Sequence, residues 1–75
     1  MSTPAEAIRE ELMASNEEYR RLRQEHTQYA SQLNSLAAKN FLTEEEKVEE
    51  VRLKKLKLRA KDQMEMLVRQ AQMVQ

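Results

Sequence analysis

The sequence predicts an all-α protein in which two long helices fold back on each other as an antiparallel coiled-coil hairpin. The 75 residues contain no glycine and only one proline, so tight β-turns and phosphate-binding loops lack their usual residue. Apolar residues recur in steps of three and four over two long segments, which is the spacing of helices that pack against a partner helix. A short stretch with a helix stop and a second helix start separates the two segments.

The first helix is predicted from about residue 4 to about residue 38. Thr3 can cap it, Pro4 suits the first helical position and Glu6 can complete a capping box. An uninterrupted heptad stripe follows, and its strict spacing predicts one continuous helix. The members of this stripe are Ile8, Leu12, Ser15, Tyr19, Leu22, His26, Tyr29, Leu33 and Leu36.

The connection between the helices is predicted at about residues 39–43. Asn40 tolerates the left-handed conformation that ends many helices. Thr43 and Glu46 have the spacing of a second capping box, and we expect Phe41 and Leu42 between them and the first helix to cover the end of the core. Because so short a connection cannot return to the far end of a helix, the two helices must be antiparallel.

The second helix is predicted over about residues 44–73 and carries two apolar stripes. The main stripe is expected to face the first helix and consists of Leu53, Leu56, Ala60, Met64, Leu67, Ala71 and Val74. The thinner stripe, Val48, Val51 and Leu58, lies on another side. One partner helix cannot cover both stripes, so we expect a homodimer or higher oligomer, with a four-helix bundle as the expected form.

The hairpin also has an expected register, because the turn is centred near Phe41. Apolar residues then face apolar residues along most of its length, with His26 as the polar exception in the middle. The expected pairs are Leu22 with Ala60, His26 with Leu56, Tyr29 with Leu53, and Leu12 with Ala71.

Composition excludes several classes of function. The absence of cysteine rules out disulfides and thiolate zinc sites, and a single histidine rules out a histidine-rich metal site. An extended helical rod lacks a concave pocket for acid–base work, so we predict no enzyme, cofactor or small-molecule substrate. The N-terminal residues do not resemble a signal peptide, and no run is long enough to span a membrane; we therefore expect a cytoplasmic location.

The segment from residue 52 to residue 61 is strongly basic and has two interpretations. Its cations are Arg52, Lys54, Lys55, Lys57, Arg59 and Lys61. They can contact an anionic partner such as nucleic acid or the ribosome. They can instead pair with Glu17, Glu18 and Glu25 across the hairpin, and with Glu49 and Glu50 on their own helix. We favour ion pairing, because the cations surround the helix and no aromatic residues alternate with them to stack on bases. In particular, Lys57 and Lys61 are expected to hold Glu25 over the contact between the helices.

His26 lies on the heptad stripe and is the sharpest candidate for chemistry. A pH switch or a metal ligand is one interpretation. A polar residue that fixes register or oligomeric state is the one that we favour. Tyr19 and Tyr29 are expected to be core residues, whereas Met64, Met66 and Met73 suit either gap filling or a partner surface.

From about residue 19 to residue 69 the chain resembles the YdcH-like family, small bacterial helical hairpins classed as a domain of unknown function. Glu25-His26, Leu-Thr-Glu-Glu-Glu at 42–46 and Leu-Lys-Lys-Leu-Lys-Leu-Arg-Ala-Lys-Asp-Gln-Met at 53–64 carry the resemblance. Tyr29, Leu56 and Ala60 depart from the family pattern. The resemblance implies a helical hairpin and assigns no activity. We therefore expect a coiled-coil protein that acts by contact with itself and with another protein; a nucleic-acid or ribosome-associated factor is the alternative.

Overall fold

The computed structural model describes residues 4–74, the side chain of Val74 excepted, so the expected cap at Thr3 lies outside the described residues. Three helices are present: α1 (Pro4–Ser15), α2 (Glu17–Ala37) and α3 (Glu44–Val74). Residues 4–74 contain no strand, which confirms the all-α class. The molecule measures 48 × 22 × 18 Å, and α3 alone accounts for the long dimension at about 1.5 Å per residue.

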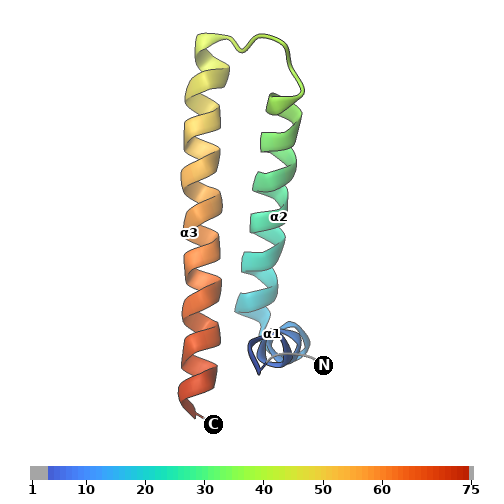
Figure 1. Cartoon of the computed structure of the whole chain (residues 1–75), viewed down its shortest axis with the longest axis vertical. Coiled ribbons are helices and arrows are strands. Elements are labelled where there is room, and N and C mark those ends of the chain that lie inside the picture. Colours follow the sequence, from blue (N-terminus) through green and yellow to red (C-terminus); the bar gives the residue numbers. More distant parts are fainter. Residues whose placement is uncertain (1–3, 75) are drawn as a thin grey trace.

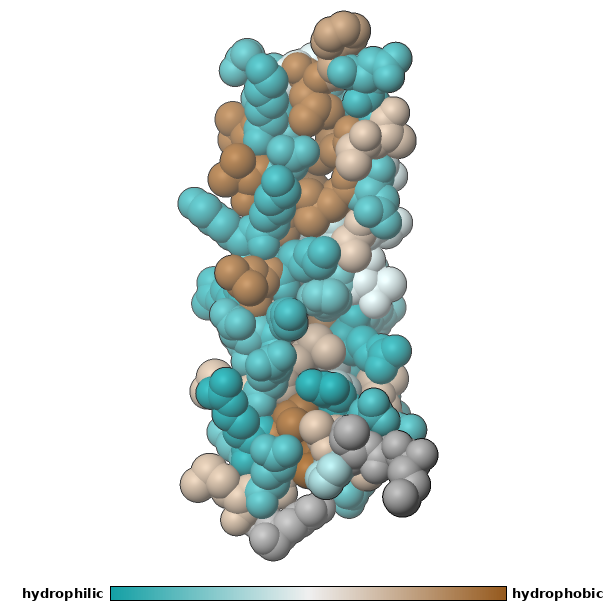
Figure 2. Space-filling view, in the orientation of Figure 1, coloured by the Kyte–Doolittle hydropathy of each residue, from teal (hydrophilic) through white to brown (hydrophobic). Residues whose placement is uncertain are grey.

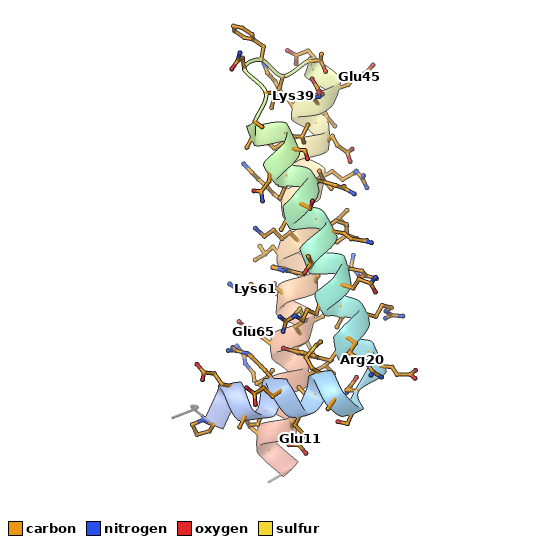
Figure 3. The ribbon with its side chains drawn as sticks, turned by 90° about the vertical axis from the view of Figure 1, so that its right-hand side faces the viewer. Glu11, Arg20, Lys39, Glu45, Lys61 and Glu65 are labelled. Atoms are coloured by element: carbon orange, nitrogen blue, oxygen red, sulfur yellow. The ribbon has the colours of Figure 1, made fainter. Side chains whose placement is uncertain are left out.

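Helices α2 and α3 lie side by side and run in opposite directions, whereas α1 turns away from the end of α2 (Figure 1). A view from the side shows α1 lying across the other two helices, close to the C-terminal part of α3 (Figure 3). The prediction of one continuous helix over residues 4–38 is therefore wrong, and the hairpin has a third helix folded across its open end.

The break occurs at Asn16, which has an extended backbone conformation with φ −117° and ψ 110°. Its side-chain Oδ1 accepts a hydrogen bond of 2.9 Å from the backbone N–H of Tyr19, which makes Asn16 the N-cap of α2. Glu17 and Glu18 follow in the first turn, where negative charge favours the start of a helix. Asn-Glu-Glu is thus a helix-start signal inside a stripe that looks continuous.

The core is densest where the three helices meet. Ile8 and Leu12 of α1 pack with Tyr19 of α2 and Val68 of α3. Half-buried Met13, Met64, Leu67 and Ala71 surround this cluster. Leu22, Leu53 and Ala60 continue the buried contact between α2 and α3. Tyr19 and Leu53 are the largest fully buried side chains.

The connection between α2 and α3 differs from its prediction in two respects. None of residues 4–74 has a positive φ, so Asn40 is not left-handed, and Ala38 caps α2 with an ordinary right-handed conformation. Phe41 is 90 % exposed and does not cover the core, whereas Leu42 is half-buried.

The capping box at the start of α3 is confirmed. The Glu46 backbone N–H donates to Thr43 Oγ1 over 3.1 Å, and the Thr43 N–H donates to Glu46 Oε1 over 2.9 Å. Lys39 also forms an ion pair with Glu46, which joins the start of the connection to the first turn of α3. These local bonds fix where α3 begins.

Candidate functional site

An uncovered row of apolar residues lies along α3 on the side away from α2. Val48, Val51 and Leu58 are 69 %, 52 % and 59 % exposed. At about 100° per residue they fall within one narrow sector opposite the buried Leu53 and Ala60. Two further exposed residues share this sector, and we call the set the outer stripe of α3: Val48, Val51, Leu58, Met66 and Met73.

The space-filling view shows apolar groups along the α3 edge of the molecule as well as in the upper part of the groove between α3 and α2 (Figure 2). Within residues 4–74, no helix packs on the outer stripe. The sequence predicts its first three members as one stripe, whereas it suggests for Met66 and Met73 only gap filling or a partner surface and does not place them on the stripe. Extending the helical periodicity of Val48, Val51 and Leu58 towards the C-terminus identifies both.

The predicted hairpin contact is buried unevenly. Fully buried members of the predicted set are Ile8, Leu12, Tyr19, Leu22, Leu53 and Ala60. The remaining members are half-buried: His26, Tyr29, Leu33, Leu36, Leu56, Met64, Leu67 and Ala71. Ser15 is exposed, because the chain bends just after it. Val68 is buried although it lies outside the predicted stripe, since α1 approaches α3 from a direction that a straight helix would not take.

The basic segment is neutralised only in part, and only by its own helix. Arg52 forms a two-pronged contact with Glu49, in which Nε lies 3.0 Å from Oε2, and Lys54 lies 3.7 Å from Glu50. The predicted pairs with Glu17, Glu18 and Glu25 across the hairpin are wrong. Glu25 lies 3.9 Å from Arg21 of its own helix. Within residues 4–74, four cations of the segment have no ion-pair partner: Lys55, Lys57, Arg59 and Lys61.

The Arg52–Glu49 contact shifts the pKa of both groups in the directions that favour their charged forms. The hydrogen bond from Arg52 lowers the pKa of Glu49, and the same bond raises the pKa of Arg52. Both side chains are exposed, so solvent screens the attraction and the contact mainly supports the first half of α3. The cations of the segment that have no ion-pair partner within residues 4–74 therefore lie after residue 54.

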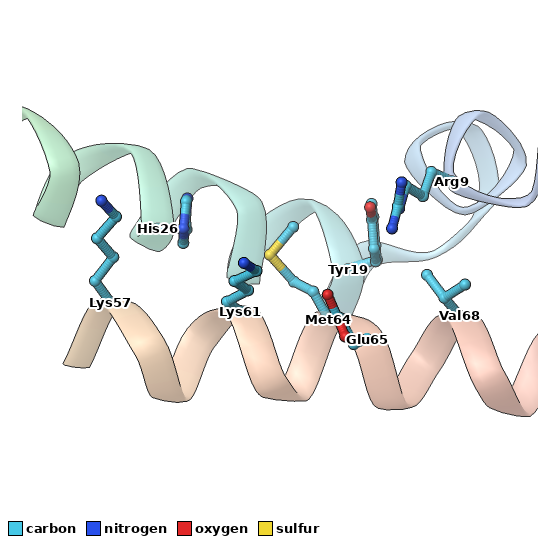
Figure 4. A pocket seen from close by; sticks show the side chains of 8 residues that line it. All are labelled: Arg9, Tyr19, His26, Lys57, Lys61, Met64, Glu65 and Val68. Carbon is cyan, nitrogen blue, oxygen red and sulfur yellow. The ribbon is translucent and has the colours of Figure 1, made fainter. Parts of the chain in front are cut away.

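A cavity of about 380 Å³ opens where α1, α2 and α3 approach one another. Tyr19, Met64 and Val68 form its apolar part. Its polar part consists of Arg9, His26, Lys57, Lys61 and Glu65. Figure 4 shows the His26 ring between Lys57 and Lys61. The prediction that these two lysines hold Glu25 is wrong, because Glu25 pairs with Arg21.

The residues around the His26 imidazole limit the chemistry that this cavity can support. His26 makes no hydrogen bond or ion pair within residues 4–74, so no neighbour fixes its ring orientation. Among the same residues no group of three or more histidine, cysteine, aspartate or glutamate side chains is placed to hold a metal ion. Cations outnumber the single carboxylate, so the cavity favours an anionic group over a cationic one.

None of the described helices is long and apolar enough to cross a lipid bilayer. No protein-family model, curated protein or solved structure matches the chain. The resemblance to the YdcH-like family therefore stays a hypothesis that rests on residues of α2, the connection and α3.

Proposed function

We propose that this protein acts as a coiled-coil interaction module that binds a second copy of itself and, through the assembled surface, another protein. The outer stripe of α3 carries the proposal. Val48, Val51 and Leu58 are each more than half exposed, and they occupy the face opposite the contact with α2. An amphipathic helix with apolar residues on both sides gains stability when a second helix covers the free side.

The position of the stripe also favours one form of assembly over another. Because the stripe lies opposite α2, a dimer formed through it has two α3 helices in the centre and one α2 on each outer side. This arrangement is a flat layer of four helices. The compact four-helix bundle expected from sequence needs a free apolar face on α2 as well, and the outward residues of α2 are polar: Arg20, Gln24, Thr27, Gln28 and Ser31.

Sedimentation equilibrium of the purified chain tests self-association. The expected result is a dimer mass that falls to the monomer mass on dilution. The double variant Val48→Ser/Val51→Ser removes apolar surface from the stripe and is expected to remain monomeric with unchanged helix content. Ala7→Ser/Ala14→Ser is the matched control, because both alanines are exposed on α1. A monomer mass for the unmodified chain at all concentrations up to the millimolar range contradicts the proposal.

A nucleic-acid or ribosome-associated function is the second candidate, and the four unpaired cations of the basic segment favour it. They do not form one surface. Lys57 and Lys61 line the cavity, whereas Lys55 lies with the outer stripe at helical spacing. A gel shift with bulk RNA over a range of salt concentrations distinguishes the candidates. Binding that weakens steeply with salt, and is lost in Lys55→Gln/Arg59→Gln, supports the second candidate over the first.

A further inference from the structure

We propose that two chains pair antiparallel through α3, with the twofold axis between Val48 and Val51. This inference rests on the self-association proposed above and specifies its geometry. It comes from a heptad-spaced series in which positions at equal distances on either side of the axis are complementary, apolar with apolar and acidic with basic. We call this series the palindrome. Within α3, Glu44, Val48, Val51, Lys55 and Leu58 follow one another in steps of four, three, four and three, and Phe41 precedes Glu44 by three residues in the non-helical connection.

Antiparallel pairing about this axis matches each residue with a suitable partner. Val48 packs on the partner's Val51, and Glu44 meets the partner's Lys55. Phe41 then reaches the partner's Leu58. Twofold symmetry repeats each contact, so one surface satisfies itself, as an isologous interface requires. Parallel pairing would instead place Glu44 on Glu44 and Lys55 on Lys55, where like charges repel.

The residues of this palindrome are free to make these contacts. Phe41 is 90 % exposed, and no ion-pair partner of Lys55 exists within residues 4–74. Glu44 has only a loose contact with Lys47, at 3.5 Å, and both side chains are well exposed. The helical part, from Glu44 to Leu58, spans about 21 Å at 1.5 Å per residue, or about four turns, and Val48, Val51 and Leu58 supply its apolar contacts.

The charged residues beside the stripe make one favourable and one unfavourable contact across the proposed dimer. Glu45 approaches the partner's Arg52 on one side, which is favourable. Lys47 approaches the partner's Lys54 on the other side, which is unfavourable. Glu50 lies 3.7 Å from Lys54 on the same helix and offsets that charge. Specificity therefore comes from the two layers that pair Glu44 with Lys55 and not from the flanks.

Charge reversal with rescue tests the register. Glu44→Lys and Lys55→Glu each turn both attractive layers into repulsive ones and are expected to weaken dimerisation roughly tenfold, as measured by sedimentation equilibrium. The double variant Glu44→Lys/Lys55→Glu restores opposite charges in an antiparallel dimer and should dimerise within about threefold of the unmodified chain. In a parallel dimer, residue 44 faces residue 44 and residue 55 faces residue 55, so the double variant still places like charges opposite each other. The double variant then dimerises no better than the single variants.

Two matched controls separate these effects from changes in net charge and in helix-end electrostatics. Glu17→Lys reverses an exposed acid in the first turn of α2, as Glu44→Lys does in α3. Arg23→Glu reverses an exposed cation on α2 that has no ion pair within residues 4–74. Both controls are expected to leave the dimerisation constant unchanged. A loss of dimer in either control overturns the assignment of Glu44 and Lys55 to the interface.

Cross-linking gives an independent measure of the same geometry, because the chain has no native cysteine. Chains with Val48→Cys and chains with Val51→Cys are mixed and oxidised. The expected product is the mixed disulfide, in clear excess over the twofold ratio to either homodisulfide that random pairing of equal amounts would give. A dominant homodisulfide overturns the antiparallel register while self-association stands. An unmodified chain that is monomeric in sedimentation overturns both the register and the proposed function.

Discussion

At the scale of single residues, Tyr19 makes the contacts that hold α1 against the hairpin. It is 2 % exposed and packs with Ile8 and Leu12 on one side and Val68 on the other. No buried side-chain polar atom within residues 4–74 lacks a hydrogen-bond partner, so this aromatic residue is buried without leaving a polar group unsatisfied. Apolar burial at the junction is the source of its stabilising effect.

Tyr19→Ala is expected to reduce the free energy of unfolding by about 3–5 kcal/mol, because it leaves a cavity where three helices meet. Urea denaturation followed by circular dichroism measures the loss. Phe41→Ala is the aromatic control and should change the unfolding free energy of the monomer by less than about 0.5 kcal/mol, since Phe41 is exposed. Both measurements belong at concentrations where the chain is monomeric. Equal losses in the two variants would contradict the observed core.

Glu46 gives the start of α3 a dependence on pH. The hydrogen bond from Lys39 lowers the pKa of Glu46, and the hydrogen bond from the Thr43 backbone lowers it further. A carboxyl with a lowered folded-state pKa contributes its full stability above the unfolded value of about 4.3, and that contribution is lost as the pH falls through the folded pKa. The capping box is therefore expected to weaken in acid.

Glu46→Gln is expected to flatten the acid part of the stability profile, because glutamine can still accept from Thr43 and does not titrate. The unfolding midpoint of the variant and the unmodified chain is measured from pH 7 down to about pH 2. Glu45→Gln is the control, since Glu45 makes no hydrogen bond or ion pair within residues 4–74. Parallel profiles for Glu46→Gln and the unmodified chain would show that the Lys39 and Thr43 contacts do not form in solution.

At the scale of elements, Asn16 decides whether residues 4–37 form one helix or two. A cap contributes about 1 kcal/mol, which is comparable to the cost of interrupting a helix by one residue. Neither the gain from the cap nor the cost of the interruption dominates. The burial of Ile8 and Leu12 against Val68 then favours the bent arrangement.

Asn16→Ala removes the cap and supplies a strong helix former, so α1 and α2 are expected to merge into one straighter helix. The maximum dimension from small-angle X-ray scattering should increase, while helix content by circular dichroism stays equal or rises. Asn16→Ser keeps a capping oxygen and should leave the scattering profile unchanged. An unchanged maximum dimension in Asn16→Ala would show that apolar packing alone maintains the bend.

Helix α3 carries apolar residues on two opposite faces. One face packs on α1 and α2 through Leu53, Ala60 and Val68. The opposite face carries the outer stripe. Ion pairs within the helix join Glu44 with Lys47, Glu49 with Arg52 and Glu50 with Lys54. One helix therefore completes the fold and still keeps an exposed apolar face.

At the scale of the whole molecule, the proposed self-association would link stability to concentration. A ligand or partner that binds only the folded state raises the unfolding midpoint by mass action. The midpoint of the unmodified chain should therefore rise as concentration increases, whereas that of Val48→Ser/Val51→Ser should remain constant. Thermal scans over a hundredfold range of concentration measure both. A midpoint of the unmodified chain that does not change with concentration would contradict a dimer coupled to folding.

The sequence by itself determined the all-α class, the start of α3 at its capping box and the existence of a second apolar stripe. These features depend on local hydrogen bonds and on helical periodicity, and both are encoded within a few turns of chain. The in-helix pairs of Arg52 and Lys54 were predictable for the same reason, since partners three or four residues apart share a helix face.

Only the tertiary structure decided the bend at Asn16, the burial of Val68, the exposure of Phe41 and the absence of cross-hairpin pairs to Glu25. Heptad spacing identifies residues that share a face only while the helix axis stays straight. One extended residue at Asn16 preserves the spacing in sequence and redirects α1 in space. The packing of α1 on α3, between residues more than fifty positions apart, then selects the bend, and no local pattern contains that information.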